Sequence, residues 1–160
     1  MRPEIKPLAI VLMAPGHVAG VKIGAMCKLI VLDDDPIQHL IFKRMLSRYT
    51  ELDDTIFCAD GNRVIGFLSL NKGNVEALPE VIFMDLHMPE LNGWKFLEKL
   101  KALYPDLVKP LKVYVISSSI DPRDIRRSRK YDFVGSYIMK PIGTEMLSLI
   151  IAPLITMVHH

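Results

Sequence analysis

Runs of apolar residues that each stop at a polar side chain constrain the fold of this chain more than any other feature. Three such runs, each of four residues, lie at 29–32, 81–84 and 113–116. A strand that is apolar at every position is buried on both faces, which is typical of a parallel sheet covered by helices. Two further strand-like segments with a mixed pattern lie at 55–59 and 135–139. We therefore expect an α/β fold with a five-stranded parallel sheet.

Helical patterns alternate strictly with these runs. Asp35-Pro36 and Asp121-Pro122 each place a capping carboxylate before a proline at the first helical position. The first helix is predicted to run to about Tyr49, and further helices are expected near 61–71, 94–104 and 144–158. This alternation predicts a three-layer sandwich with helices on both faces of the sheet. The first helix should turn one apolar face to the core, formed by Ile37, Leu40, Ile41, Met45 and Leu46.

Composition narrows the class of protein. The chain has 160 residues, of which 50% are hydrophobic and 24% charged, which fits one globular domain. A net charge of +2 is too small to imply nucleic acid or an anionic membrane as the main partner. Cys27 and Cys58 are expected to be buried free thiols, as in a cytoplasmic protein. Residues 1–26 have no steady period, and we expect a dispensable, disordered extension before a domain at 27–158.

Polar residues follow the ends of four predicted strands. They are the acidic group Asp33-Asp34-Asp35, then Asp85, Ser117 and Lys140. In an open parallel sheet the carboxyl ends of the strands share one edge, and ligands bind there. Clustered carboxylates repel one another, and a divalent cation removes the conflict. A ligand set of oxygens without His or Cys favours Mg²⁺, with Mn²⁺ also possible.

Together these groups can perform phosphoryl transfer, which needs mainly placement and neutralisation of oxygen charge. Asp85 would accept the phosphoryl group, Lys140 would supply positive charge and Ser117 a hydroxyl donor. Each residue alone has a simpler interpretation: the acidic group as a solvated helix cap, and Asp85 as a turn residue. Their joint placement at strand ends favours one site.

These segments resemble the receiver domain of two-component response regulators. The resemblance covers about residues 27–158 and lies in 31–36, 84–93, 116–118 and 137–141. It implies a flavodoxin-like fold with strand order 2-1-3-4-5 and a cis Lys140-Pro141 peptide bond. It also implies that Asp85 takes its phosphoryl group from a histidine kinase or a phosphotransfer protein.

The resemblance assigns further roles to individual residues. Mg²⁺ would be held by Asp34, Asp85 and the backbone carbonyl of His87, with Asp33 acting through water. Lys140 and Ser117 would bind the phosphoryl oxygens. Tyr137 would act with Ser117 as a rotameric switch, and His87 and Ser119 would set the lifetime of the phosphate.

Phosphorylation is then expected to reshape the surface formed by the helix after Asp121, the strand 135–139 and the last helix, and so to control a protein partner. The first of these helices carries five basic residues, which form either a solvated face or a docking site for an acidic partner or a second copy: Arg123, Arg126, Arg127, Arg129 and Lys130. The last helix has few polar positions, which predicts exposed apolar area and a possible homodimer. Pro153 should kink or end it.

Two other functions remain open at this point. One is a receiver-like scaffold that binds partners without phosphorylation. The other is a phosphohydrolase with an aspartyl-phosphate intermediate, although His87 occupies the place where such enzymes typically carry a second acid. We expect no enzymatic activity beyond self-phosphorylation and autodephosphorylation.

Overall fold

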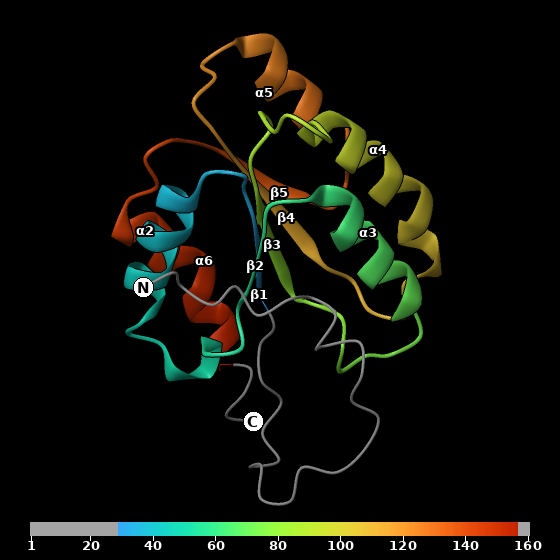
Figure 1. Cartoon of the computed structure of the whole chain (residues 1–160), viewed down its shortest axis with the longest axis horizontal. Coiled ribbons are helices and arrows are strands. Elements are labelled where there is room, and N and C mark those ends of the chain that lie inside the picture. The colour runs from blue at the N-terminus through green and yellow to red at the C-terminus, as the bar shows by residue number, and fades with distance from the viewer. Residues whose placement is uncertain (1–28, 157–160) are drawn as a thin grey trace, which may run out of the picture.

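A computed structural model describes residues 29–156, which form a parallel sheet between layers of helices (Figure 1). The strands are β1 (Leu29–Leu32), β2 (Ile56–Cys58), β3 (Val81–Met84), β4 (Lys112–Ser117) and β5 (Val134–Met139). All neighbouring strands are parallel, in the order β2-β1-β3-β4-β5. The predicted flavodoxin-like fold and strand order are therefore confirmed. The predictions for residues 1–26, for Cys27 and for the chain beyond residue 156 lie outside the described residues.

Five α-helices connect and follow the strands. They are α2 (Pro36–Leu46), α3 (Gly61–Leu70), α4 (Gly93–Leu103), α5 (Pro122–Ser128) and α6 (Thr144–Thr156), with short 3₁₀ turns η1 (Thr50–Leu52) and η2 (Tyr104–Asp106). Figure 1 shows α2 and α6 on one side of the sheet and α3 and α4 on the other, with α5 next to the start of α4. The first helix ends at Leu46, earlier than expected, and residues 50–52 form a separate 3₁₀ turn.

The central strands are buried on both faces. In β1, Ile30 and Leu32 belong to the hydrophobic cluster that includes residues of α3 and α4. Leu29 and Val31 belong to the second cluster, with residues of α2 and α6. Alternate side chains of one strand thus enter two different cores, which explains why the run has no polar position.

The predicted core face of α2 is partly wrong. Three of its expected members are exposed in the structure: Ile37, Leu40 and Ile41. The buried residues are His39, Phe42 and Leu46, and Met45 is half-buried against the same core. Phe42 sets this orientation by packing against Phe83 of β3, with 5.3 Å between ring centroids. The helix carries apolar residues on several sides, so their spacing did not identify the face that packs.

His39 is a buried histidine whose Nε2 atom has no hydrogen-bond partner. Its ring lies 5.5 Å from that of Phe57. Burial lowers the pKa of His39 and outweighs the opposing effect of the nearby Asp33 carboxylate. The folded protein therefore binds a proton at His39 less readily than the unfolded chain does.

We expect the free energy of unfolding to fall as the pH drops through the ordinary histidine pKa of 6.5, because protons then bind the unfolded chain preferentially. Urea denaturation at about pH 7.5 and about pH 5.5 measures this loss. His39→Leu should lose less stability on acidification than the wild type, whereas His87→Leu, at an exposed position, should behave like the wild type. Equal acid sensitivity of His39→Leu and wild type would contradict the assignment.

The last helix, α6, buries Leu147 and Ile151 but leaves Met146 and Leu149 exposed. The predicted exposed apolar area is thus confirmed. Pro153 lies inside α6, which continues to Thr156, so the helix does not end at the proline. Within residues 29–156, no helix is long and apolar enough to cross a membrane.

Candidate functional site

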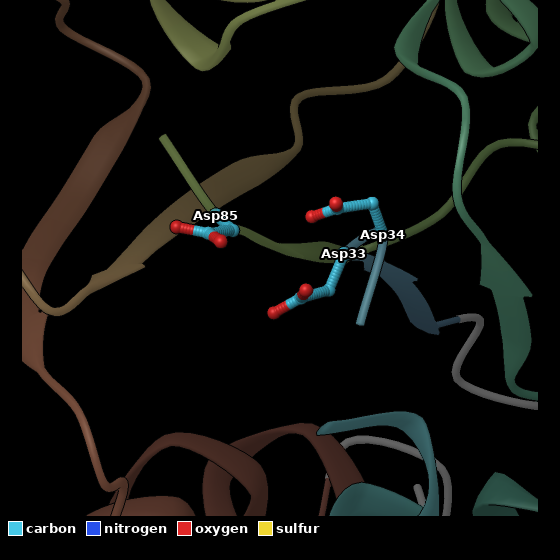
Figure 2. A group of neighbouring side chains, drawn as sticks. All are labelled: Asp33, Asp34 and Asp85. Carbon is cyan, nitrogen blue, oxygen red and sulfur yellow. The ribbon is translucent and has the colours of Figure 1, made fainter. Parts of the chain in front are cut away.

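Three carboxylates meet at the carboxyl ends of two adjacent strands. Asp33 and Asp34 directly follow β1, and Asp85 directly follows β3 (Figure 2). Each offers a carboxylate oxygen, and these oxygens all lie within 4.8 Å of one another. Asp33 and Asp85 are buried, whereas Asp34 is exposed. The site therefore combines two buried carboxylates with one that solvent can reach.

Backbone amides hold the two buried carboxylates in place. The amide of His87 donates to Asp85 Oδ1 at 3.1 Å, and the amide of Asp35 donates to Asp33 Oδ1 at 2.9 Å. The amide of Asp85 itself donates to the carbonyl of Leu32 at 3.0 Å, which extends the pairing of β3 with β1 beyond the strand. Each carboxylate thus keeps its second oxygen for another partner.

The loop after Asp85 returns close to its own start. The amide of Gly93 donates to the carbonyl of Leu86 at 2.9 Å. A Cβ atom at Gly93 would lie 2.6 Å from Leu86 Cα and 2.8 Å from the Asp85 carbonyl oxygen. Only glycine permits this approach of α4 to the loop, so the residue fixes where α4 begins relative to Asp85.

Lys140 joins the two buried carboxylates. Its Nζ lies 2.9 Å from Asp33 Oδ2 and 3.2 Å from Asp85 Oδ2. Burial alone lowers the pKa of Lys140, but the hydrogen bond to Asp33 and the charges of Asp33 and Asp85 raise it overall. The Lys140-Pro141 peptide bond is cis, as expected.

The charges of this cluster fit a divalent cation. Three carboxylates and one ammonium leave two negative charges. The side-chain atoms that these carboxylates offer to a metal ion are all oxygens. Mg²⁺ prefers such oxygens and uses only one or two protein carboxylates together with water and phosphate. The exposed Asp34 gives the ion access from solvent.

Ser117 and Tyr137 belong to the next two strands along the sheet. Ser117 is fully buried at the end of β4, and its Oγ accepts a hydrogen bond from the Ser119 amide at 3.1 Å. Tyr137 in β5 is half-buried, and its hydroxyl donates to the Ser119 carbonyl at 2.8 Å. The amide of Lys140 donates to the Ser117 carbonyl at 2.9 Å, which ties β5 to β4 beside the site.

The structure thus brings some of the predicted residues together more closely than others. Asp33, Asp34, Asp85 and Lys140 form one cluster. Ser117 hydrogen-bonds Ser119 rather than the cluster, and the side chain of His87 is exposed, with only its amide bound to Asp85. The predicted role of the His87 carbonyl stays a prediction.

Two contacts of α5 were not predicted from the sequence. Asp124 accepts a hydrogen bond from the Ser119 hydroxyl at 2.6 Å. The Arg127 guanidinium lies 4.2 Å from the centre of the Trp94 ring, at the start of α4. The one signal for Asp124 was its acidity in a helix that is otherwise rich in arginine. Arg123 forms an ion pair with Asp121. Two of the five basic residues, Arg123 and Arg127, therefore have partners within the chain.

The fold and the acidic cluster define an open α/β protein whose site lies between β1 and β3, where the order of the strands reverses. The family model for the response regulator receiver domain matches residues 29–152. The chain therefore belongs to the receiver-domain family of two-component signalling, as the sequence resemblance indicated.

Similar proteins agree with this membership. The two-component response regulator ORR1 of Oryza sativa subsp. japonica is 27% identical over 74% of this chain, which spans 51% of that protein. A two-component response regulator from Cytophaga hutchinsonii matches with a TM-score of 0.70 and 24% identity, over 82% of this chain and 98% of that chain. The phosphorylated cyanobacterial phytochrome response regulator RcpA matches with a TM-score of 0.64 and 25% identity, over 82% and 93%.

Proposed function

We propose that this protein is a signalling switch that accepts a phosphoryl group on Asp85 from a histidine kinase or a phosphotransfer protein. The observation that carries the proposal is the Lys140 ammonium, which contacts Asp33 and Asp85 beside the open carboxylate of Asp34. One oxygen of Asp85 attacks phosphorus while the bond from phosphorus to the donor's histidine nitrogen breaks. Lys140, the His87 amide and the Ser117 hydroxyl then bind the phosphoryl oxygens.

The chain's own residues also define where Mg²⁺ would bind. We assign Asp34, Asp85 and the His87 carbonyl as direct ligands and Asp33 as a ligand through water, with Mn²⁺ as a possible substitute. When bound, the ion neutralises charge on the phosphoryl oxygens. The spacing of the carboxylate oxygens supports this assignment.

Asp34→Asn is expected to lower the affinity for Mg²⁺ by about tenfold or more, the loss typical even of outer-shell partners. The chain has one tryptophan, Trp94, next to the loop that follows Asp85, so its fluorescence can follow a Mg²⁺ titration. Asp54→Asn is a suitable control, because Asp54 is exposed and lies outside the cluster. An unchanged Mg²⁺ affinity in Asp34→Asn would remove Asp34 from the ligand set.

Incubation with acetyl phosphate and Mg²⁺ tests the function directly. We expect intact mass to rise by one phosphoryl group, with a parallel change in Trp94 fluorescence. Absence of any phosphorylated species, with acetyl phosphate or with phosphorylated kinase domains, would leave the scaffold function as the better account. Turnover of small phosphate esters would instead favour the phosphohydrolase.

The output of the switch is the surface of α5, β5 and α6. We propose that phosphorylation draws Ser117 toward Asp85 and that Tyr137 follows, which changes this surface for a protein partner. We place the protein in the cytoplasm, a proposal supported by the free, buried thiol of Cys58. Its chemistry is limited to its own phosphorylation and dephosphorylation.

Exposed apolar residues on α6 support a homodimer as part of the same proposal. Met146 is 42% exposed and Leu149 is 71% exposed. We expect sedimentation to show a dimer at high protein concentration, more strongly when beryllofluoride and Mg²⁺ are present. Leu149→Gln should weaken this dimer, and a monomer under all these conditions would exclude it.

A further inference from the structure

Ser119 forms a hydrogen bond with each of its polar groups, and together these bonds link the site to α5. Its amide donates to Ser117 Oγ at 3.1 Å, and its carbonyl accepts from the Tyr137 hydroxyl at 2.8 Å. Its own hydroxyl donates to Asp124 Oδ2 at 2.6 Å. One residue therefore contacts both proposed switch residues and the first turn of α5.

The Asp124 carboxylate does not make the hydrogen bond that is usual for an acidic residue in the first turn of a helix. It is three residues after the N-cap Asp121, where an acidic side chain often accepts from the amide of the N-cap itself. Here the Asp121 amide donates to Ser119 Oγ at 3.3 Å, and Asp124 accepts the hydroxyl proton of Ser119. The side chain of Ser119 thus lies between the cap and the carboxylate and ties both to the end of β4.

We propose that Asp124 is a positioning residue that couples Ser117 and Tyr137 to α5 through Ser119. This inference rests on the proposed function. When Ser117 Oγ moves toward phosphoryl oxygens on Asp85, the Ser119 amide loses its acceptor and the segment at Ser119 shifts. Because a hydrogen bond to a carboxylate is roughly twice as strong as a neutral one, the first turn of α5 follows Ser119.

A second contact limits how far α5 depends on Asp124. Arg127, one turn further along α5, stacks on Trp94 at the start of α4. This contact lies on the side of α5 that faces α4 and does not involve Ser119. Loss of the hydrogen bond from Ser119 to Asp124 should therefore uncouple α5 from the site without releasing the helix from the protein.

Hydrogen exchange of α5 amides, with and without beryllofluoride and Mg²⁺, tests the coupling in the full chain. We compare wild type with Asp124→Ala and Ser119→Ala, which remove the hydrogen bond from either side. Asp124→Asn and Ser119→Thr keep an acceptor and a hydroxyl and serve as conservative variants. Asp132→Ala is the charge control, because Asp132 is an exposed carboxylate that follows α5.

In wild type we expect beryllofluoride to change the hydrogen exchange of the amides of residues 123–128. Asp124→Ala and Ser119→Ala should still bind beryllofluoride, but the change in hydrogen exchange of α5 should fall to less than half of the wild-type change. The conservative variants and Asp132→Ala should retain the wild-type change. If both alanine variants show the full wild-type change in hydrogen exchange of α5, the inference is overturned. A fall in their melting temperatures would not rescue it, because the loss of helix capping alone explains such a fall. A wild type that binds no beryllofluoride would overturn the proposed function and this inference together.

Discussion

Asp85→Asn is expected to abolish phosphorylation by acetyl phosphate while leaving the fold intact. The asparagine has nearly the shape of the aspartate and can still accept from the His87 amide, which is 3.1 Å from Asp85 Oδ1. Its neutral amide oxygen is a poor nucleophile and does not form the acyl phosphate. The substitution also removes one negative charge from a crowded cluster, so we expect no loss of stability from charge repulsion.

Intact mass after incubation with acetyl phosphate and Mg²⁺ is the measurement, with circular dichroism to establish the fold. Asp85→Ala should give the same result. Asp54→Asn, at an exposed position, should be phosphorylated like the wild type. A folded Asp85→Asn variant that still gains a phosphoryl group would move the acceptor to another residue, with Asp34 the first to examine because it shares the cluster.

The meeting of these side chains at one site could be predicted, because it follows from the parallel arrangement of the strands. Asp33 and Asp85 stand at the ends of runs that are apolar at every position, which marks buried parallel strands. Parallel strands end at one edge, so residues far apart in sequence meet without any knowledge of side-chain contacts. Lys140 reaches the same edge from β5, and its contact with both carboxylates is in accord with that reasoning.

Features that depend on side-chain packing could not be predicted in the same way. The orientation of α2 is set by Phe42 against Phe83, a contact between elements that helix periodicity does not contain. The bond from Ser119 to Asp124 lies in a loop and a short helix, where no repeating pattern exists. The stacking of Arg127 on Trp94 likewise joins two helices that are separate in sequence.

Lys140 supplies the positive charge within hydrogen-bond reach of the two buried carboxylates, so its removal should be costly for folding. The side chains of Asp33 and Asp85 are only 5% and 8% exposed, and each lies within 3.2 Å of Lys140 Nζ. Without the ammonium, two buried negative charges face one another beside Asp34. Removing one partner of a buried ion pair typically costs about 3 kcal/mol or more. Lys140→Met, which keeps the length of the side chain, should therefore lower the free energy of unfolding by about this amount near neutral pH.

Mg²⁺ should restore much of the stability that Lys140→Met loses, because the ion supplies the missing positive charge. Ligand linkage adds about 2.7 kcal/mol at a concentration one hundred times the dissociation constant. Urea denaturation of wild type and variant with increasing Mg²⁺ measures both effects, and Lys112→Met is the control because Lys112 is exposed. We expect Lys140→Met to gain more stability from Mg²⁺ than the wild type does, since its site is more negative by one charge. If Mg²⁺ stabilises the two proteins equally, the ion binds away from these carboxylates, and the charge balance that links Lys140, Asp33 and Asp85 to the metal is incorrect.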